Sequence, residues 1–304
     1  MSGSHKPLLI VVCGPTAIGK TSTAIELAKH FHCPILSFDS RQFYTELRVG
    51  NARPTEEELE QAEHHFIANR SIKDVYTAGM FETDSLEKLN EIFQTHKACI
   101  AVGGSGLYIN ALCYGIDNIP ADEAFREKLE DRLKLEGLKI LQQEVKKIDP
   151  DFYKQADMQN PRRVMRALEA YHLTGIPYSR QRKESNKERP FQTFWVGLEM
   201  EREALFERIN RRVDVMMKEG LLEEARSLHP YKGLKALKTV GYRELFDHLD
   251  GEHDLEEAVR LIKRNSRRYA KQQIGWFRKN QEVHWFSPSN ISGMIHRIEE
   301  NFMP

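Results

Sequence analysis

The sequence predicts an α/β protein: a parallel β-sheet flanked by helices, with a helical insertion lobe. In the first hundred residues, short apolar segments alternate with segments of helical period, which is typical of strand–helix–strand crossovers in a parallel sheet. Residues 120–189 are charged, helical in period and free of apolar runs typical of buried strands. The segment "FWVGLEM" at Phe194–Met200 then resembles a strand that returns the chain to the sheet.

These changes in pattern divide the 304 residues into three parts. We expect the first part of the core at 1–119, the helical insertion at 120–189 and the second part of the core at 190–304. Within the insertion, Pro161 suits the first turn of a helix and Gly175 suits its C-terminal stop. The chain after the returning strand is mostly amphipathic helix.

The elements of the first hundred residues are justified by apolar runs and by helical periodicity. Each of the three strands should end in a segment of functional interest, because ligands of such sheets bind beyond the carboxyl ends of the strands. In order, we expect a strand at Leu8–Cys13, a helix at about Lys20–His30, a strand "PILSF" ending at Asp39, a helix-rich stretch around Thr55–Asn69, a helix near Asp84–His96 and a strand "ACIAV" that ends in "GGSG".

Composition limits the classes of protein that need considering. With 40% hydrophobic and 30% charged residues, the chain is typical of a globular protein, and its longest apolar run is too short to cross a bilayer. The four cysteines form no C-x-x-C pair, which favours reduced, buried thiols and a cytoplasmic protein without a signal peptide. The formal net charge is zero, although its distribution along the chain is uneven.

The strongest motif is "GPTAIGKT" at Gly14–Thr21, which matches G-x-x-x-x-G-K-[ST] directly after a strand and at the start of a helix. Glycines in such a loop let backbone N–H groups converge on phosphate oxygens at the positive end of the helix dipole. Lys20 adds a positive charge, and the hydroxyl of Thr21 is suited to Mg²⁺. A nucleotide such as ATP is the default ligand of this loop.

Asp39 is the only acid that ends a predicted strand. A nucleotide triphosphatase usually carries a metal-binding acid after a second strand, but "ACIAV" ends in glycine. Three roles are therefore open for Asp39: a metal ligand, a general base, or a structural cap of the next turn. The glycines of "GGSG" suit a close approach to a ligand or a plain turn before a helix.

Two basic groups stand out against the neutral total. Between Arg260 and Lys279 there are eight Lys/Arg residues and no acid. Six of them fall on one side of a helix, where like charges repel and a polyanion would stabilise them: Arg260, Lys263, Arg264, Arg267, Arg268 and Lys271. Trp276 and Phe277 follow, suited to the core or to stacking on a base. The second group lies in the insertion: Arg162, Arg163, Arg166, Arg180, Arg182, Lys183, Lys187 and Arg189. Together they predict a nucleic acid held by both faces.

With these motifs in place, the chain resembles the tRNA dimethylallyltransferase (tRNA isopentenyltransferase) family over nearly its whole length. The matching stretches are "GPTAIGKT", "SFDSRQFY", "VGGSGLYI", "RRVMRALEAYHLTG", "TVGYRELFDHLDG" and "YAKQQIGWFRK". The resemblance implies a P-loop kinase-like core, a Mg²⁺ requirement and transfer of a dimethylallyl group from dimethylallyl diphosphate to N6 of adenosine 37 of tRNA. It implies that the insertion grips the anticodon stem. We also expect no membrane partner and a monomer.

The same resemblance implies roles for individual residues. The prenyl diphosphate would be held by Gly14, Thr16, Ala17, Ile18, Gly19, Lys20, Thr21 and Arg212. Asp39 would accept the N6 proton. Ser40, Arg41 and Gln42 would hold the edge of the adenine, and other tRNA contacts would fall on Ser105, Arg126, Arg163, Arg166, Lys238, Arg243, Lys271, Gln273 and Arg278. The chain departs from the family pattern at Asn51, Arg53, Ser105, Gln272 and Gly275.

Three alternatives share some of these features. An adenylate isopentenyltransferase acting on free AMP, ADP or ATP would need the loop and Asp39 but not two basic faces. A P-loop small-molecule kinase would consume ATP and use Asp39 to activate an acceptor hydroxyl. An RNA-binding module with a vestigial loop would bind tRNA without turnover.

Overall fold

The computed structural model describes residues 6–117, 119–182 and 187–302. The chain forms two compact units. The first comprises Met1–Cys113 and Arg189–Pro304, and the second comprises Tyr114–Glu188. The second unit thus begins before residue 120, where the sequence pattern changes.

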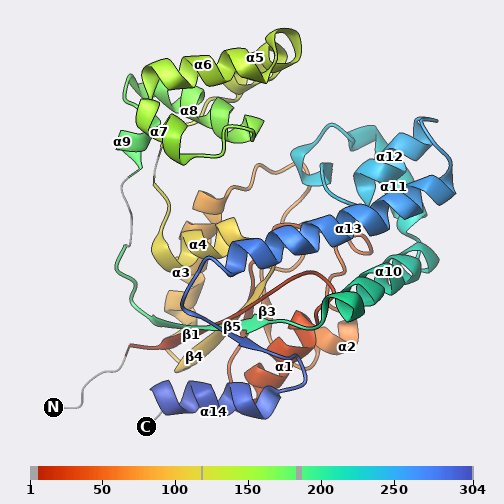
Figure 1. Ribbon diagram of the computed structural model, residues 1–304. Helices are drawn as coiled ribbons and strands as arrows, with labels where there is room; N and C mark the ends of the chain where they lie inside the picture. Colours follow the sequence, from red (N-terminus) through yellow and green to blue (C-terminus); the bar gives the residue numbers. More distant parts are fainter. Residues whose placement is uncertain (1–5, 118, 183–186, 303–304) are drawn as a thin grey trace. The chain divides into compact units, whose positions relative to one another are not determined.

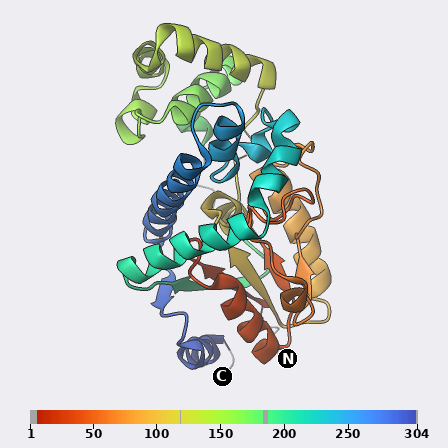
Figure 2. The ribbon, with the colours of Figure 1, turned by 90° about the vertical axis from the view of Figure 1, so that its right-hand side faces the viewer.

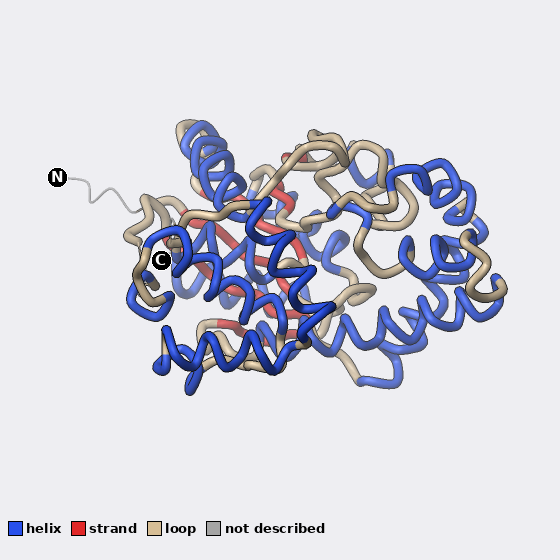
Figure 3. Tube along the Cα trace, turned by 90° about the horizontal axis from the view of Figure 1, so that it is seen from above, coloured by secondary structure: helices blue, strands red, loops and turns tan. Residues whose placement is uncertain are grey.

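The first unit is built on a six-stranded sheet in the order β3-β2-β4-β1-β5-β6, in which every pairing is parallel. The predicted α/β class with a parallel sheet is therefore confirmed. β1 lies between β4 and β5, and all six of its residues are buried. The strands, red in Figure 3, run side by side: β1 (Leu8–Cys13), β2 (Ile35–Ser37), β3 (His64–His65), β4 (Ala98–Gly103), β5 (Gln192–Leu198) and β6 (Val283–Phe286).

Helices cover both faces of this sheet (Figures 1 and 2). α1 and α14 lie on one face, where a hydrophobic cluster joins them to the strands, and α3 and α4 lie on the opposite face. A second cluster unites α10 to α13 beyond the carboxyl ends of the strands. The helices of this unit are α1 (Lys20–Phe31), α2 (Glu56–Leu59), α3 (Ala78–Ile92), α4 (Gly106–Tyr114), α10 (Arg202–Lys218), α11 (Leu221–Leu228), α12 (Tyr242–Leu249), α13 (Leu255–Phe277) and α14 (Ile291–Phe302).

One sequence expectation for this unit is wrong. The stretch Thr55–Asn69 contains only one helical turn, α2, closed by a capping box between Thr55 and Glu58. β3 follows, and Phe66 (φ 62°) and Ala68 (φ 48°) adopt left-handed conformations that prevent a helix. The terminal part also contains a strand, β6, which pairs with β5 at the edge of the sheet. Four residues in a helix-rich region are too few to show a period of two.

The described residues of the second unit form five helices around a small core of their own. The bounds of α8 agree with the roles expected of Pro161 and Gly175, since Pro161 opens the helix and Gly175 (φ 69°) follows its last residue. The helices are α5 (Glu123–Glu136), α6 (Leu138–Ile148), α7 (Pro150–Gln155), α8 (Pro161–Thr174) and α9 (Tyr178–Gln181), packed on Leu129, Leu141, Val145, Phe152, Val164 and Leu168.

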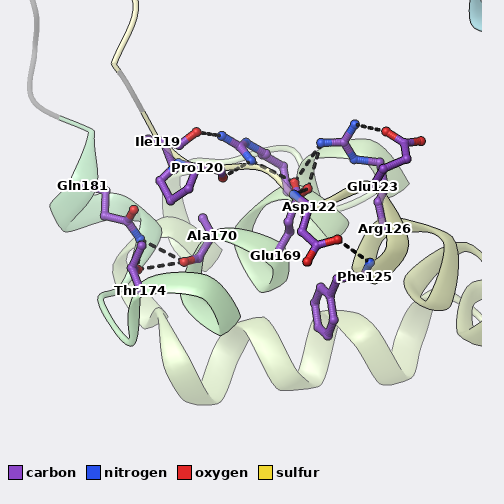
Figure 4. A network of polar contacts seen from close by, with 11 residues as sticks. Ile119, Pro120, Asp122, Glu123, Phe125, Arg126, Glu169, Ala170, Thr174 and Gln181 are labelled. Carbon is purple, nitrogen blue, oxygen red and sulfur yellow. Dashed lines mark hydrogen bonds and ion pairs between the residues drawn. The ribbon is translucent and has the colours of Figure 1, made fainter. Parts of the chain in front are cut away.

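A buried carboxylate organises the start of this unit (Figure 4). The Glu169 side chain is 1% exposed and receives hydrogen bonds from the Asp122 backbone N–H and from the guanidinium groups of Arg126 and Arg166. Arg166 also donates to the carbonyls of Ile119 and Pro120. Burial raises the pKa of Glu169, but these hydrogen bonds more than offset it and leave the pKa below its usual value.

This network includes Arg126 and Arg166, which the family resemblance assigns to tRNA; their side chains are 30% and 27% exposed, so those contacts stay a prediction. Their guanidinium groups are committed to Glu169 and to carbonyls of the same unit, because an ionised carboxylate cannot be buried without partners. Arg163, on the same helix, is exposed and remains available. Lys183 lies outside the described residues.

We predict that Arg166→Met lowers the free energy of unfolding by about 2 kcal/mol, because Glu169 loses a charged donor and keeps its burial. Arg163→Met is the matched control and should change stability by less than about 0.5 kcal/mol. Urea unfolding followed by circular dichroism measures both values. Equal stabilities of the two variants would contradict the structural role of Arg166.

Candidate functional site

A large cavity opens at the carboxyl ends of β1, β2 and β4 in the first unit. Its volume is about 1280 Å³. The phosphate loop and Asp39 line it, together with the loop 48–58 and side chains from α10 and α13. The position agrees with the general rule for ligands of parallel sheets.

The phosphate loop adopts a conformation that few residue types allow. Gly14 (φ 148°) lies so close to β5 that a Cβ there would be 3.0 Å from the carbonyl oxygen of Leu198. Ala17 (φ 64°) and Gly19 (φ 107°) are both left-handed. α1 begins at Lys20 with no side-chain cap and no acid in its first turn. Its amino end is thus suited to an anion.

Three cationic side chains converge on this loop. Lys20 Nζ donates to the Pro15 carbonyl (2.8 Å), Arg212 Nη1 donates to Thr16 Oγ1 (3.1 Å) and Arg208 Nε donates to the Ala17 carbonyl (2.9 Å). Burial lowers the pKa of Lys20 to about 8, opposed by the negative charge of Asp39. Burial likewise lowers the pKa of Arg212. Buried positive charges of this kind are stabilised by an anionic ligand.

Asp39 lies just beyond the carboxyl end of β2 and lines the cavity. Its Oδ1 accepts a hydrogen bond from the Arg41 backbone N–H (3.0 Å), and its own N–H donates to Ser37 Oγ (3.2 Å). These bonds fix the carboxylate at the strand exit, where its charge acts on both Lys20 and Arg212. A carboxylate oriented in this way is equipped to accept a proton from a bound substrate.

Ser105 and Ser40 connect two strand exits. Ser105 Oγ accepts from the Ser40 N–H and donates to Ser40 Oγ, both at 3.0 Å. The Gln42 amide is held between Ser37 Oγ and the Ala52 carbonyl, and Arg41 Nη1 donates to the Ala236 carbonyl (3.0 Å). Of the residues expected at the adenine edge, Arg41 and Gln42 thus line the cavity, and Ser40 lies beside them, bonded to Ser105.

The loop 48–53 is a part of the site that the sequence analysis missed. Glu224 of α11 accepts the backbone N–H groups of Arg48, Val49 and Gly50, each at 2.9 Å, and the hydroxyl of Tyr242. No local pattern revealed this contact, because Glu224 lies about 175 residues away in a helix with many charges.

Within the same loop, Asn51 donates to the carbonyls of Arg41 and Leu47 and accepts from the Arg53 N–H. The departure from the family pattern at Asn51 therefore serves the shape of the cavity wall.

The predicted basic face of α13 is divided by its contact with α10 (Figures 1 and 2). Lys263 pairs with Asp214 (2.5 Å), and Arg267 donates to Asn210. Arg268 and Lys271 remain exposed. The six residues were expected to form one free face; that is wrong, since the side of the helix toward α10 is paired.

The other expected nucleic-acid contacts differ in exposure. Lys238 and Arg243 are exposed near α12. Arg278 is also exposed, and its Nη2 lies 3.4 Å from Glu199 Oε2. Gln273, in contrast, is 5% exposed and lines the cavity rather than the outer surface. Arg189 belongs to the first unit, where it is nearly buried and pairs with Glu82 (2.7 Å).

A Mg²⁺ ion fits what the loop offers. Among the described residues, no cluster of three or more His, Cys, Asp or Glu side chains could bind a metal by itself. Mg²⁺ typically takes one or two protein ligands together with substrate phosphates and water. The Thr21 hydroxyl on the first turn of α1 is placed to be such a ligand.

The G-x-x-x-x-G-K-[ST] loop and Asp39 line one cavity, an arrangement that suits transfer of a group from a donor that carries phosphate. Residues 42–280 match the family model described as IPP transferase, and the chain belongs to that family. The predicted resemblance is thereby confirmed.

Similar proteins match nearly the full chain. The chain is 49% identical to a tRNA dimethylallyltransferase of Christiangramia forsetii over 96% of its length and 97% of the relative. It is 46% identical to tRNA dimethylallyltransferase 1 of Bacteroides fragilis, with the same coverages.

Two solved structures are also similar. The tRNA isopentenylpyrophosphate transferase of Bacillus halodurans is 37% identical, with a TM-score of 0.71 over 97% of this chain and 95% of that one. A eukaryotic dimethylallyltransferase acting on tRNA is 25% identical, with a TM-score of 0.76 over 97% of this chain and 77% of that one.

We predict that the affinity for inorganic pyrophosphate falls as the pH rises through about 8 and above. Lys20 loses its proton in this range, because burial has lowered its pKa, and the neutral amine no longer attracts the anion. Calorimetric titration at several pH values measures the slope. In Lys20→Arg, whose guanidinium stays charged, the fall should be much smaller. Identical slopes would show that another group governs binding.

Proposed function

We infer that this protein transfers a dimethylallyl group to tRNA. The observation that carries this inference is the match along 96% of the chain to enzymes named tRNA dimethylallyltransferase, which includes both the cavity and the insertion. An adenylate isopentenyltransferase is not favoured, because the relatives and structural neighbours are enzymes of tRNA.

We propose that the phosphate loop binds dimethylallyl diphosphate rather than ATP. The loop amides, Lys20 and Arg212 would stabilise the negative charge that builds on the diphosphate as the allylic C–O bond breaks. Nucleotide triphosphatases usually carry a metal-binding acid at the end of a second apolar strand. The strand that would have this role here, β4, ends in glycine and supplies no such acid. Mg²⁺ held at the Thr21 hydroxyl would add positive charge at the leaving group.

The acceptor would be N6 of adenosine 37, presented to the cavity from the anticodon loop. Its lone pair is delocalised into the ring, so the amine needs help from a base. As N6 forms its bond to the allylic carbon, Asp39 would take the N6 proton and diphosphate would leave. Bases of a single-stranded loop can turn out of their stack at modest cost.

The exposed cations of the first unit provide a tRNA surface around the cavity: Arg268, Lys271, Lys238, Arg243 and Arg278. Arg163 would contribute from the insertion. These side chains would contact phosphates, which position a nucleic acid without identifying its sequence. Among the described residues, no helix is long and apolar enough to cross a membrane. We further propose that the enzyme acts in the cytoplasm as a monomer.

The test is transfer of label from radioactive dimethylallyl diphosphate, with Mg²⁺, to unmodified tRNA or to AMP. We expect label on adenosine of tRNA alone. Asp39→Asn should lower turnover roughly 100-fold or more with tRNA binding retained, because the proton acceptor is lost. Asp247→Asn, an exposed site on α12, is the control and should retain activity.

The outcomes separate the alternatives. Label on AMP would indicate the free-nucleotide enzyme, and ATP hydrolysis without labelled product would indicate a kinase. Full turnover by Asp39→Asn would remove Asp39 from the role of base.

A further inference from the structure

Gln273 is one of eight buried polar or charged residues among the described parts of the chain, and the chemistry above does not use it. It lies near the end of α13, and its side-chain amide extends to the phosphate loop. Gln273 Oε1 accepts a hydrogen bond from the Thr16 backbone N–H (2.8 Å), and Nε2 donates to the Gly104 carbonyl (3.0 Å). One amide thus joins the loop after β1 to the exit of β4.

The glycines at that exit are explained by α13. A Cβ on Gly104 would lie 2.1 Å from Gln273 Nε2, and a Cβ on Gly106 would lie 2.1 Å from Trp276 Nε1. Because a Cβ at either position would collide with α13, Gly104 and Gly106 admit the helix rather than a bound ligand. The close approach brings the amide within reach of both backbones.

Two hydrogen bonds made by Thr16 fix the conformation of the phosphate loop at this residue. Its N–H is taken by Gln273, and its hydroxyl is held by Arg212 (3.1 Å). Only an amide satisfies both backbone groups, since it offers one acceptor and one donor. A carboxylate would place an oxygen against the Gly104 carbonyl, and an apolar side chain would leave a buried N–H and C=O unpaired.

We propose that Gln273 is a positioning residue for diphosphate binding, which orients the phosphate loop from α13 through the backbone of Thr16. This inference rests on the proposed function, in which the loop holds the prenyl diphosphate. The opposite side of α13 is exposed at Arg268 and Lys271, in the surface proposed for tRNA. The helix therefore supports the donor loop with one side and presents cations with the other.

The test measures the affinity of the full-length protein for inorganic pyrophosphate, with Mg²⁺, by calorimetry. Gln273→Met keeps the length of the side chain and removes both hydrogen bonds, so we expect binding to weaken about tenfold or more. The affinity for unmodified tRNA should stay within about twofold, because the exposed side of α13 is unchanged. In turnover, the KM for dimethylallyl diphosphate should rise and the KM for tRNA should not.

A matched control separates positioning from general stability. Gln142 is another part-buried glutamine, whose Nε2 donates to the Met158 carbonyl (2.8 Å) in the helical insertion. Gln142→Met should lower the melting temperature and leave pyrophosphate affinity unchanged. Wild-type affinity in Gln273→Met, or equal losses for pyrophosphate and tRNA, would overturn the proposal.

A double-mutant cycle provides a second test that does not depend on Gln273→Met folding well. Gly104→Ala should weaken pyrophosphate binding by displacing the amide. In a Gln273→Ala background the space is free, so Gly104→Ala should add less than about twofold. Additive losses would contradict the link.

Failure of this proposal can be told from failure of the proposed function. If the wild type labels tRNA but the Gln273 variants bind pyrophosphate normally, the positioning role alone is wrong. If the wild type binds pyrophosphate but labels no tRNA, the proposed function is wrong. The pyrophosphate affinities of the Gln273 variants then still decide whether Gln273 positions the loop.

Discussion

The site depends on one constraint: the phosphate loop must keep a backbone conformation in which Ala17 and Gly19 are left-handed. Three distant segments supply the support. β5 packs against Gly14, α10 binds the loop through Arg208 and Arg212, and α13 binds it through Gln273. Since β1 lies between β4 and β5, each of these segments can approach the same strand exit.

Charge is the second determinant of the cavity. Lys20 and Arg212 are both positive and desolvated, and Asp39 is the carboxylate whose charge opposes the shifts in their pKa values. Lys20 Nζ donates to the Pro15 carbonyl and lies in the first turn of α1. In the proposed mechanism, a diphosphate would place negative charge opposite Lys20 and Arg212, while Asp39 would keep its position for proton transfer. The same groups would then serve both donor binding and departure of the leaving group.

The sequence predicted those parts of the protein that local patterns encode. The sheet, the phosphate loop and Asp39 follow from apolar runs, glycine spacing and strand exits. The family motifs suggested the other site residues, such as Arg212 and Ser105. Contacts between distant segments were not predictable. Glu224 reaches the loop 48–50 from α11, and Gln273 turned out to be buried although its motif had suggested a surface contact. The periodicity of α13 gave the positions of its cations but not the presence of α10 beside them.

In the proposed function, the phosphate loop selects a prenyl diphosphate over a nucleotide. Competition between dimethylallyl diphosphate and ATP, with Mg²⁺, for labelled pyrophosphate bound to the wild-type protein tests it most directly. We expect dimethylallyl diphosphate to displace the label at far lower concentration than ATP, with both displacements weakened in Arg212→Met. Tighter binding of ATP would contradict the claim and return the cavity to the class of nucleotide sites.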